Sequence, residues 1–369
     1  MKFTCQKSDL FEVLPNIAKA TSVKTPMEVL SAIRLQAEDQ HLSLTGYDLE
    51  LGMRTEIPAS VEEKGVLLAD SRLFSELIRR MPEGIVTIET DDRLKITITG
   101  GGTECQLAGM QADEYPDLPD IEQKEGVLIP QKQFRDMIDQ TIYAVSLDET
   151  KPIFTGELIE IEDDMLNIVA LDNYRMALRT EPLVGQGKMK FVVPAKALRE
   201  ISHLLEDDEK NEKPCVIRLD QHQASFEIHG YIVYTRLLAG EFVNYRRSIP
   251  QNVKTEVYFS RKELIDSLDR CSLLISEKNK TAVQFQFEED SVTISCQNVL
   301  GSVEDQLSCD MTGEKMVIGF NNRYLLEAVR AIQGDRVKLM LSGPDRAVKV
   351  MEADGESSIA IIMPVQVRR

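Results

Sequence analysis

Apolar and polar positions along the chain repeat one pattern three times, in which an apolar strand leads directly into an amphipathic helix. The three copies read KFTCQKSDLFEVL, VLIPQKQFRDMI and VYFSRKELIDSL, and their matching apolar positions are Leu10, Phe134 and Leu264. The copies therefore lie about 125 to 130 residues apart, which is the size of a small domain and far longer than a solenoid repeat.

A second strand and helix recur at the same spacing, as LLADSRLFSELIRRM, VVPAKALREISHLL and IGFNNRYLLEAVRAI. Between the two helices of each copy lie stretches of alternating hydrophobicity, which predict strands, with Asp48, Asp172 and Asn298 at matching places. Each copy is thus an α+β unit with two helices packed on an antiparallel sheet. The predicted helical segments are 6–20, 71–81, 131–143, 195–205, 261–274 and 321–333.

Two proline-containing segments interrupt the periodicity, DEYPDLPDIEQKEG at 113–126 and RRSIPQNVKTE at 246–256. Proline and clustered polar residues without periodicity are typical of linkers. We therefore predict three tandem, pseudo-equivalent domains over residues 1–123, 124–250 and 251–369.

Composition narrows the class of protein. No run of 18 or more apolar residues is present, and the N-terminal MKFTCQKSDLF has no signal-peptide core, so we expect a soluble cytoplasmic protein without a membrane partner. The six cysteines show no CxxC spacing and the four histidines stand apart. We expect reduced cysteines, no metal and no cofactor.

The formal net charge of −18 argues by itself against nucleic-acid binding. The predicted helical segments differ from the rest, because they carry 14 Lys and Arg against 10 Asp and Glu. If all these helices share one face, that face is basic on an acidic body. Ordinary solvated helix faces are the alternative interpretation. The basic residues concerned are Arg72, Arg79, Arg80, Lys196, Arg199, Arg323 and Arg330.

Other runs could suggest catalysis. The carboxylate runs at 162–164 and 206–209 could serve a metal-dependent hydrolase, but consecutive carboxylates at predicted turns are typical of solvated loops. The glycine-rich run at 99–104 lacks the GK[ST] ending of a phosphate-binding loop, so a hairpin turn explains it better. A scaffold that binds proteins but not DNA stays a further alternative.

Several longer segments carry a specific resemblance: MKFT at the N-terminus, LSLTGYDLE at 42–50, MPEG at 81–84, LAGEFVNYRRSIP at 238–250 and IIMPVQV at 361–367. From end to end, the chain resembles the bacterial beta sliding clamp family, the processivity subunit of the replicative DNA polymerase. The resemblance implies three clamp domains in each chain and a head-to-tail homodimer that closes into a six-domain ring around double-stranded DNA. It also implies a non-catalytic tether that requires no cofactor.

The resemblance further implies three sets of functional residues. Those that would touch DNA, without reading its sequence, are Lys24, Arg72, Arg79, Lys151, Lys196 and Arg199. The dimer interface would include Leu77, Leu107, Arg270, Leu273 and Leu274, with an edge strand at 105–110 available for pairing. The pocket that docks short linear motifs of the polymerase, the clamp loader and repair proteins would comprise Phe154, Leu171, Asn173, Tyr174, Arg175, Met176, Val243, Arg247, Ser248, Met363, Pro364, Val365 and Gln366.

The apolar chain end IAIIMPVQV follows the polar MEADGESS, so it either completes a core strand or lines a groove. Departures from the family pattern lie near this predicted pocket. Val243 replaces the proline of many relatives, and Asn279 replaces an aromatic residue of some, which affects the expected motif preference. Arg368 and Arg369 extend past the usual apolar end and either pair with acidic residues of a motif or stay solvated.

Overall fold

The computed structural model describes residues 1–22, 25–121, 124–207, 213–275 and 281–366. The predictions made for Lys24, Asn279, Arg368 and Arg369 lie outside these residues. The described residues form two compact units, 1–132 with 196–237 (unit 1) and 133–195 with 238–369 (unit 2). Residues of the predicted second domain belong to both units, and the two predicted domain boundaries stay predictions.

The described residues contain six α-helices, one within each predicted helical segment, so the expected α+β class is confirmed. Side chains cap several of them: Asp70 accepts a hydrogen bond from the Leu73 amide, and Ser260 accepts one from the Glu263 amide. None of these helices is long and apolar enough to span a membrane. Their bounds are α1 Lys7–Ala18, α2 Ser71–Arg80, α3 Gln131–Asp139, α4 Ala195–Leu204, α5 Arg261–Ser272 and α6 Asn322–Ala331.

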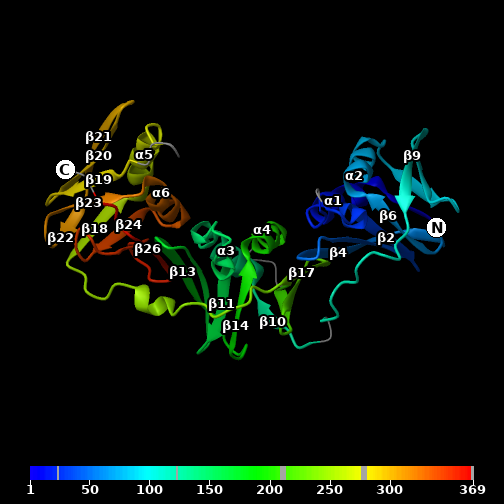
Figure 1. The fold of residues 1–369 in the computed structure, drawn as a ribbon, viewed down its shortest axis with the longest axis horizontal. Helices are drawn as coiled ribbons and strands as arrows, with labels where there is room; N and C mark the ends of the chain where they lie inside the picture. The colour runs from blue at the N-terminus through cyan, green and yellow to red at the C-terminus, as the bar shows by residue number, and fades with distance from the viewer. Residues whose placement is uncertain (23–24, 122–123, 208–212, 276–280, 367–369) are drawn as a thin grey trace. The chain divides into compact units, whose positions relative to one another are not determined.

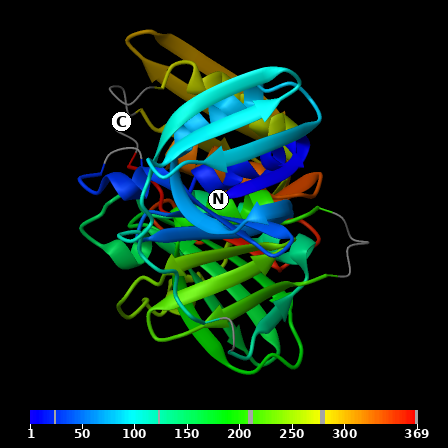
Figure 2. The same cartoon turned by 90° about the vertical axis from the view of Figure 1, so that its right-hand side faces the viewer.

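Unit 1 is built on a 13-stranded antiparallel sheet in the order β10-β15-β16-β17-β4-β3-β2-β6-β9-β8-β7-β1-β5 (Figure 1). Helices α1 and α2 pack against each other. In Figure 2 the strands around β9, drawn in cyan, lie in front of these helices. The strands are β1 Lys2–Gln6, β2 Ala32–Glu38, β3 His41–Tyr47, β4 Leu51–Pro58, β5 Ser60–Glu63, β6 Gly65–Asp70, β7 Ile85–Thr90, β8 Lys95–Gly100, β9 Thr103–Met110, β10 Val127–Ile129, β15 Cys215–Leu219, β16 Gln223–Ile228 and β17 Tyr231–Arg236.

Unit 2 contains a nine-stranded sheet, β14-β11-β12-β13-β26-β25-β24-β18-β22, and a four-stranded sheet, β21-β20-β19-β23. Buried side chains from strands of both sheets and from α5 and α6 form one core, which includes Phe259, Phe285 and Phe320. The strands are β11 Gly156–Glu162, β12 Met165–Leu171, β13 Arg175–Pro182, β14 Met189–Pro194, β18 Thr255–Ser260, β19 Val283–Phe287, β20 Ser291–Asn298, β21 Gly301–Ser308, β22 Asp310–Thr312, β23 Met316–Phe320, β24 Arg336–Leu341, β25 Val348–Glu352 and β26 Ser358–Ile362.

Both large sheets run across a predicted domain boundary. In unit 1, β4 pairs with β17 so that Leu51 lies opposite Thr235. In unit 2, β13 pairs with β26 so that Arg175 lies opposite Ile362. Adjacent copies of the repeat are therefore joined edge to edge by backbone hydrogen bonds. We call these two pairings the intrachain junctions.

Among the described residues, several strands have an open edge, and β9 and β21 are two of them. Strand β21 ends its four-stranded sheet. Strand β9 pairs with β8 along its length but with β6 only at Gly109 and Met110, so the edge of residues 103–108 that faces away from β8 has no strand partner. Exposed edges of this kind readily pair with another chain.

Candidate peptide-binding site

The segment after the last strand of unit 2 is held by backbone hydrogen bonds while its side chains stay exposed. The Met363 amide donates to the Tyr174 carbonyl at 2.8 Å, and the Val365 amide donates to the Gly319 carbonyl at 2.8 Å. Within β26, Ala360 to Ile362 are buried. The strand of the apolar chain end therefore completes a core, and the residues beyond it reach the surface. Whether they line a groove for a ligand stays a prediction.

Exposed apolar side chains gather where this segment meets the middle of the chain. Tyr174 is 59% exposed, Val243 44%, Met363 43% and Val365 40%. We call these four residues the apolar patch. Large apolar side chains that stay exposed together mark a surface for binding another molecule.

A buried cluster supports the apolar patch from below. It includes Leu171, Met176, Phe242 and Ile361, with Phe154 packed against it. The rings of Phe154 and Phe242 meet edge to face, with centroids 5.7 Å apart. Because this base is packed and the chain end is hydrogen-bonded, the backbone that carries the apolar patch is held in place before any ligand arrives.

Arg175 follows Tyr174 in the chain and is buried, with only 7% of its side chain exposed. Its Nε donates to Asp172 at 3.1 Å, and its Nη1 donates to Glu327 on α6. The guanidinium also lies over the ring of Tyr324, 4.3 Å from the centroid. Arg175 thus joins β13 to α6, and the role in the pocket that the family resemblance implied for it stays a prediction.

Glu160 anchors the 3-10 helix Tyr245–Ser248, which follows Val243. The buried carboxylate accepts hydrogen bonds from the Tyr245 hydroxyl at 2.8 Å and from Arg246 Nη2 at 2.7 Å. Burial of Glu160 opposes its ionisation, but these hydrogen bonds and the charges of Arg246 and Lys190 outweigh burial and lower its pKa. The ionised carboxylate therefore stabilises this segment.

We expect Tyr245→Phe to lower the free energy of unfolding by about 1 kcal/mol at pH 7, because Glu160 loses one hydrogen bond. A carboxylate with a lowered folded-state pKa contributes stability above its unfolded pKa and loses it as the pH falls through the folded pKa. The difference from the wild type should therefore shrink below about pH 4.3, the ordinary pKa of glutamate. Urea unfolding at pH 7 and at pH 3.5 measures it, and a difference that does not depend on pH would contradict this role of Glu160.

The structure brings most of the predicted pocket residues together within unit 2. Phe154, Leu171 and Met176 belong to the supporting cluster, and the remaining predicted residues Asn173, Arg247, Ser248, Pro364 and Gln366 are exposed or half-buried nearby in the chain. Their role in binding a peptide stays a prediction. Tyr324 was missed: its ring stacks on Tyr174 with centroids 6.5 Å apart, but helical periodicity alone gave no sign of this partner.

Four of the residues predicted to touch DNA lie in unit 1, and all four are exposed: Arg72 and Arg79 on α2, and Lys196 and Arg199 on α4. Arg79 pairs with Glu76 at 2.7 Å, and Lys196 pairs with Asp48 at 2.5 Å. Lys151, in unit 2, is also exposed and donates to Asn173 at 3.3 Å. The role of these residues on DNA is likewise a prediction.

The predicted interface residues of unit 2 include a prominent exposed apolar side chain, since Leu273 is 82% exposed. Leu274 and Arg270 lie beside it in sequence, and Arg270 Nε donates to Asp305 on β21 at 2.9 Å. The sequence interpretation missed Val299, which is 93% exposed at the tip of the β20–β21 hairpin, together with Leu300. Leu77 and Leu107, the predicted interface residues of unit 1, are half-buried.

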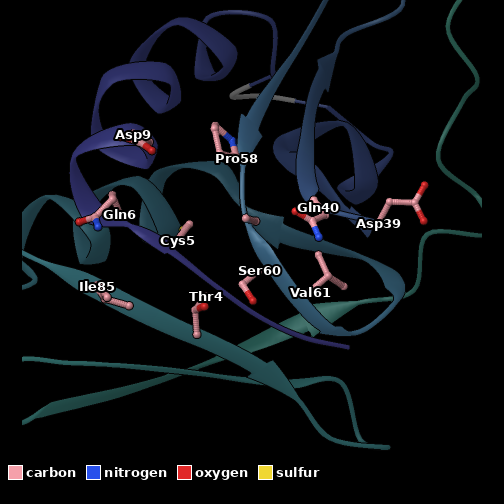
Figure 3. A pocket seen from close by; sticks show the side chains of 11 residues that line it. Thr4, Cys5, Gln6, Asp9, Asp39, Gln40, Pro58, Ser60, Val61 and Ile85 are labelled. Carbon is pink, nitrogen blue, oxygen red and sulfur yellow. The ribbon is translucent and has the colours of Figure 1, made fainter.

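A cavity of about 400 Å³ lies elsewhere, in unit 1 between β1, β5 and the turn at Asp39 (Figure 3). Its lining includes Cys5, Asp9, Ser60 and Ile85, and none of the predicted site residues. Lys64 pairs with Asp39 at 2.5 Å. Among the described residues, no group of three or more His, Cys, Asp or Glu side chains is arranged to hold a metal ion.

Comparisons with known proteins agree along the whole chain. Family models of the DNA polymerase III beta subunit match its N-terminal domain at residues 1–119, its central domain at 128–244 and its C-terminal domain at 246–366. A beta sliding clamp of Bacillus subtilis (strain 168) is 32% identical, over 99% of this chain and 100% of the relative. The chain therefore belongs to the DNA polymerase III beta subunit family, the beta sliding clamps.

Solved structures give the same result for the fold. The DNA polymerase sliding clamp from Bacillus subtilis matches with a TM-score of 0.95 and 31% identity, over 100% of both chains. A sliding clamp from Pseudomonas aeruginosa bound to griselimycin matches with a TM-score of 0.92 and 25% identity, also over 100% of both chains. The three clamp domains expected from the repeats are therefore confirmed.

Proposed function

We propose that two copies of this chain close head to tail into a six-domain ring around double-stranded DNA and tether the replicative polymerase to it. The protein is then a non-catalytic processivity factor in the cytoplasm, which needs no cofactor. Its three domains span residues 1–123, 124–250 and 251–369.

The open edges of β9 and β21 carry this proposal. Strands β4 and β13 each follow a matching turn, after Asp48 and Asp172, and each pairs with a strand of the next repeat. Strand β21 follows the third such turn, after Asn298, but has no partner on that edge in its own chain among the described residues. A heterologous interface that repeats the same step closes into a ring when the rotation fits. Strand β9 of a second copy supplies the missing partner.

Topological linkage lets an acidic protein stay on DNA. Once the duplex is enclosed, the pore needs only weak, sequence-independent contacts to phosphates, which water can mediate. The exposed Arg72, Arg79, Lys196 and Arg199 supply positive charge of this kind. The strongly negative remainder repels DNA from other faces.

The apolar patch is the proposed docking site for short linear motifs of the polymerase, the clamp loader and repair proteins. Its exposed aromatic and apolar side chains suit an apolar motif, and Met363 has a flexible thioether that adapts to different side chains. Val243 and the neighbouring Arg247 set which motifs fit best.

The first test is retention on DNA. With its loader and ATP, the protein should stay on nicked circular DNA and be lost once a restriction enzyme makes the circle linear. Equal retention on both forms would overturn topological clamping. Retention on neither, with binding of the peptide motif preserved, would identify a scaffold that ignores DNA.

We expect the double substitution Arg79→Glu with Lys196→Glu to slow loading or sliding, because it reverses two charges of the proposed DNA-facing set. Reversal of Arg79 should change the fold little, since its ion pair with Glu76 is exposed on both sides and contributes at most about 1 kcal/mol. Lys196 pairs with Asp48, whose side chain is only 9% exposed, so circular dichroism has to show that the double variant keeps its fold. Single-molecule diffusion on DNA at several salt concentrations measures sliding. Unchanged loading and diffusion in the double variant would remove these residues from the DNA-facing set.

A further inference from the structure

The two intrachain junctions share one register, and this register can be transferred to the open edges. Three hairpins show which residues correspond on the first strand of each junction, namely β4, β13 and β21. Across the turn, Leu51 pairs with Asp48, Arg175 with Asp172, and Gly301 with Asn298. Gly301 on β21 therefore holds the position that Leu51 and Arg175 hold on β4 and β13.

The corresponding residues on the second strand, β17 or β9, follow from the hairpins β16–β17 and β8–β9, which both have two-residue turns. Tyr231 opens β17 opposite Ile228, and Thr103 opens β9 opposite Gly100. The far ends of the two strands give the same correspondence. The Leu238 amide, just after β17, donates to the Val192 carbonyl on β14, and Met110 at the end of β9 pairs with Leu68 on β6. Residue numbers on β9 are thus 128 lower than on β17, and Leu107 matches Thr235.

This correspondence gives a definite alignment between β21 of one copy and β9 of the next. Leu51 lies opposite Thr235 in the first junction, so Gly301 lies opposite Leu107 in the third. Val303 then lies opposite Cys105. This alignment also places the side chains of Val303 and Cys105 on the core face of their sheets, since Val303 packs on the core of unit 2 and Cys105 pairs with the buried Ile98. One step further along, Glu304 lies opposite Glu104.

We propose that Glu104 of one copy and Glu304 of the other face each other across the dimer junction and make it weaker than the intrachain junctions. This inference rests on the proposed head-to-tail dimer. The two glutamates are exposed, and Glu104 accepts a hydrogen bond from Gln106 Nε2 at 2.8 Å. Like charges directly opposite each other on neighbouring strands destabilise their pairing.

The intrachain junctions carry no such charge pair at this position. Arg54 lies opposite Ile232 in the first, and Leu178 lies opposite Ile359 in the second. Leu178 and Ile359 pack in the cluster that supports the apolar patch, which stabilises their junction. The carboxylate pair therefore distinguishes the junction that has to open for DNA to enter from the two that stay closed.

The energetic test compares the dimer dissociation constants of the wild type, Glu104→Gln, Glu304→Gln and the double variant. Each single change should tighten the dimer up to about fivefold per junction, and up to about 25-fold for a ring with two junctions. The double variant should gain little more, because the repulsion needs both charges. Glu125→Gln removes an exposed carboxylate outside both strands and should change nothing.

Ionic strength gives a second readout. Salt screens exposed charges, so raising the ionic strength should tighten the wild-type dimer more than the Glu104→Gln dimer. Single variants that bind as the wild type does, or more weakly, would overturn the charge pair.

A disulfide tests the alignment directly, because Cys105 is the one cysteine of the described chain that is not buried. In Val303→Cys, diamide should oxidise the new thiol and Cys105 of the second copy to a disulfide, giving a covalent dimer on a non-reducing gel. Ser302→Cys, which points to the other face, and Val303→Cys with Cys105→Ser should give none. A dimer that forms without this disulfide overturns the alignment alone, whereas absence of any dimer overturns the proposed ring.

Discussion

Replacing both Met363 and Pro364 by alanine is expected to weaken binding of an apolar peptide motif about 30-fold or more, while the protein stays dimeric. Burying a methionine side chain contributes about 1.5 to 3 kcal/mol, and each 1.4 kcal/mol is a factor of ten in affinity. The fold should survive, because Met363 and Val365 are held through their backbone amides, which alanine preserves. Fluorescence anisotropy of a labelled peptide and light scattering measure the two properties.

Val184→Ala is the matched control, since Val184 is 74% exposed in unit 2 outside the apolar patch. It should leave peptide affinity unchanged. Loss of dimerisation in the Met363 and Pro364 variant would assign the chain end to the core instead of a binding surface. Unchanged peptide affinity would remove the apolar patch as the docking site.

The second large effect is expected at Arg175, where alanine should lower the free energy of unfolding by about 3 kcal/mol. Removing one partner of a buried ion pair leaves the other charge uncompensated, which typically costs about 3 to 5 kcal/mol. The lower end applies here, because Asp172 is well buried but Glu327 is about one-third exposed. Urea unfolding measures the change.

Arg323→Ala provides the control for Arg175. Arg323 is exposed on α6 and lies over the same Tyr324 ring, 5.4 Å from the centroid. An exposed contact of this kind contributes about 1 kcal/mol at most. If Arg175→Ala kept full stability but lost peptide binding, Arg175 would contact the peptide directly and its structural role would be wrong.

The elements of the fold could be predicted from the sequence because hydrophobic periodicity is local. All six helices of the described residues fall within their predicted segments. The prediction of 131–143 as one helix was too long, because α3 ends at Asp139. Just beyond it, the Thr141 hydroxyl bonds to the Met137 carbonyl and to the buried Glu157, and a 3-10 turn follows. Periodicity alone could not reveal a partner 16 residues away.

Candidate sites were harder to predict from residue patterns. The pocket residues came from a family resemblance, and no residue pattern indicated that Arg175 is buried while its neighbour Tyr174 is exposed. Tyr174 lies in the turn before β13 and Arg175 begins that strand, so the burial of each depends on which distant elements pack against it. The stacking of Tyr174 on Tyr324 likewise joins residues 150 positions apart.

The sequence by itself determined the threefold repeat, the α+β class and the helices, because these depend on local periodicity. It also determined the family, because several segments of the chain resemble that family residue by residue. Only the tertiary structure decided which strand edges pair, with β4 on β17 and β13 on β26, and which edges of β9 and β21 stay open. It also supplied the register that places Glu304 opposite Glu104 in the proposed dimer. The physical reason is that strand pairing is non-local: backbone hydrogen bonds are alike at every residue, so only the packed chain selects the partner and the alignment.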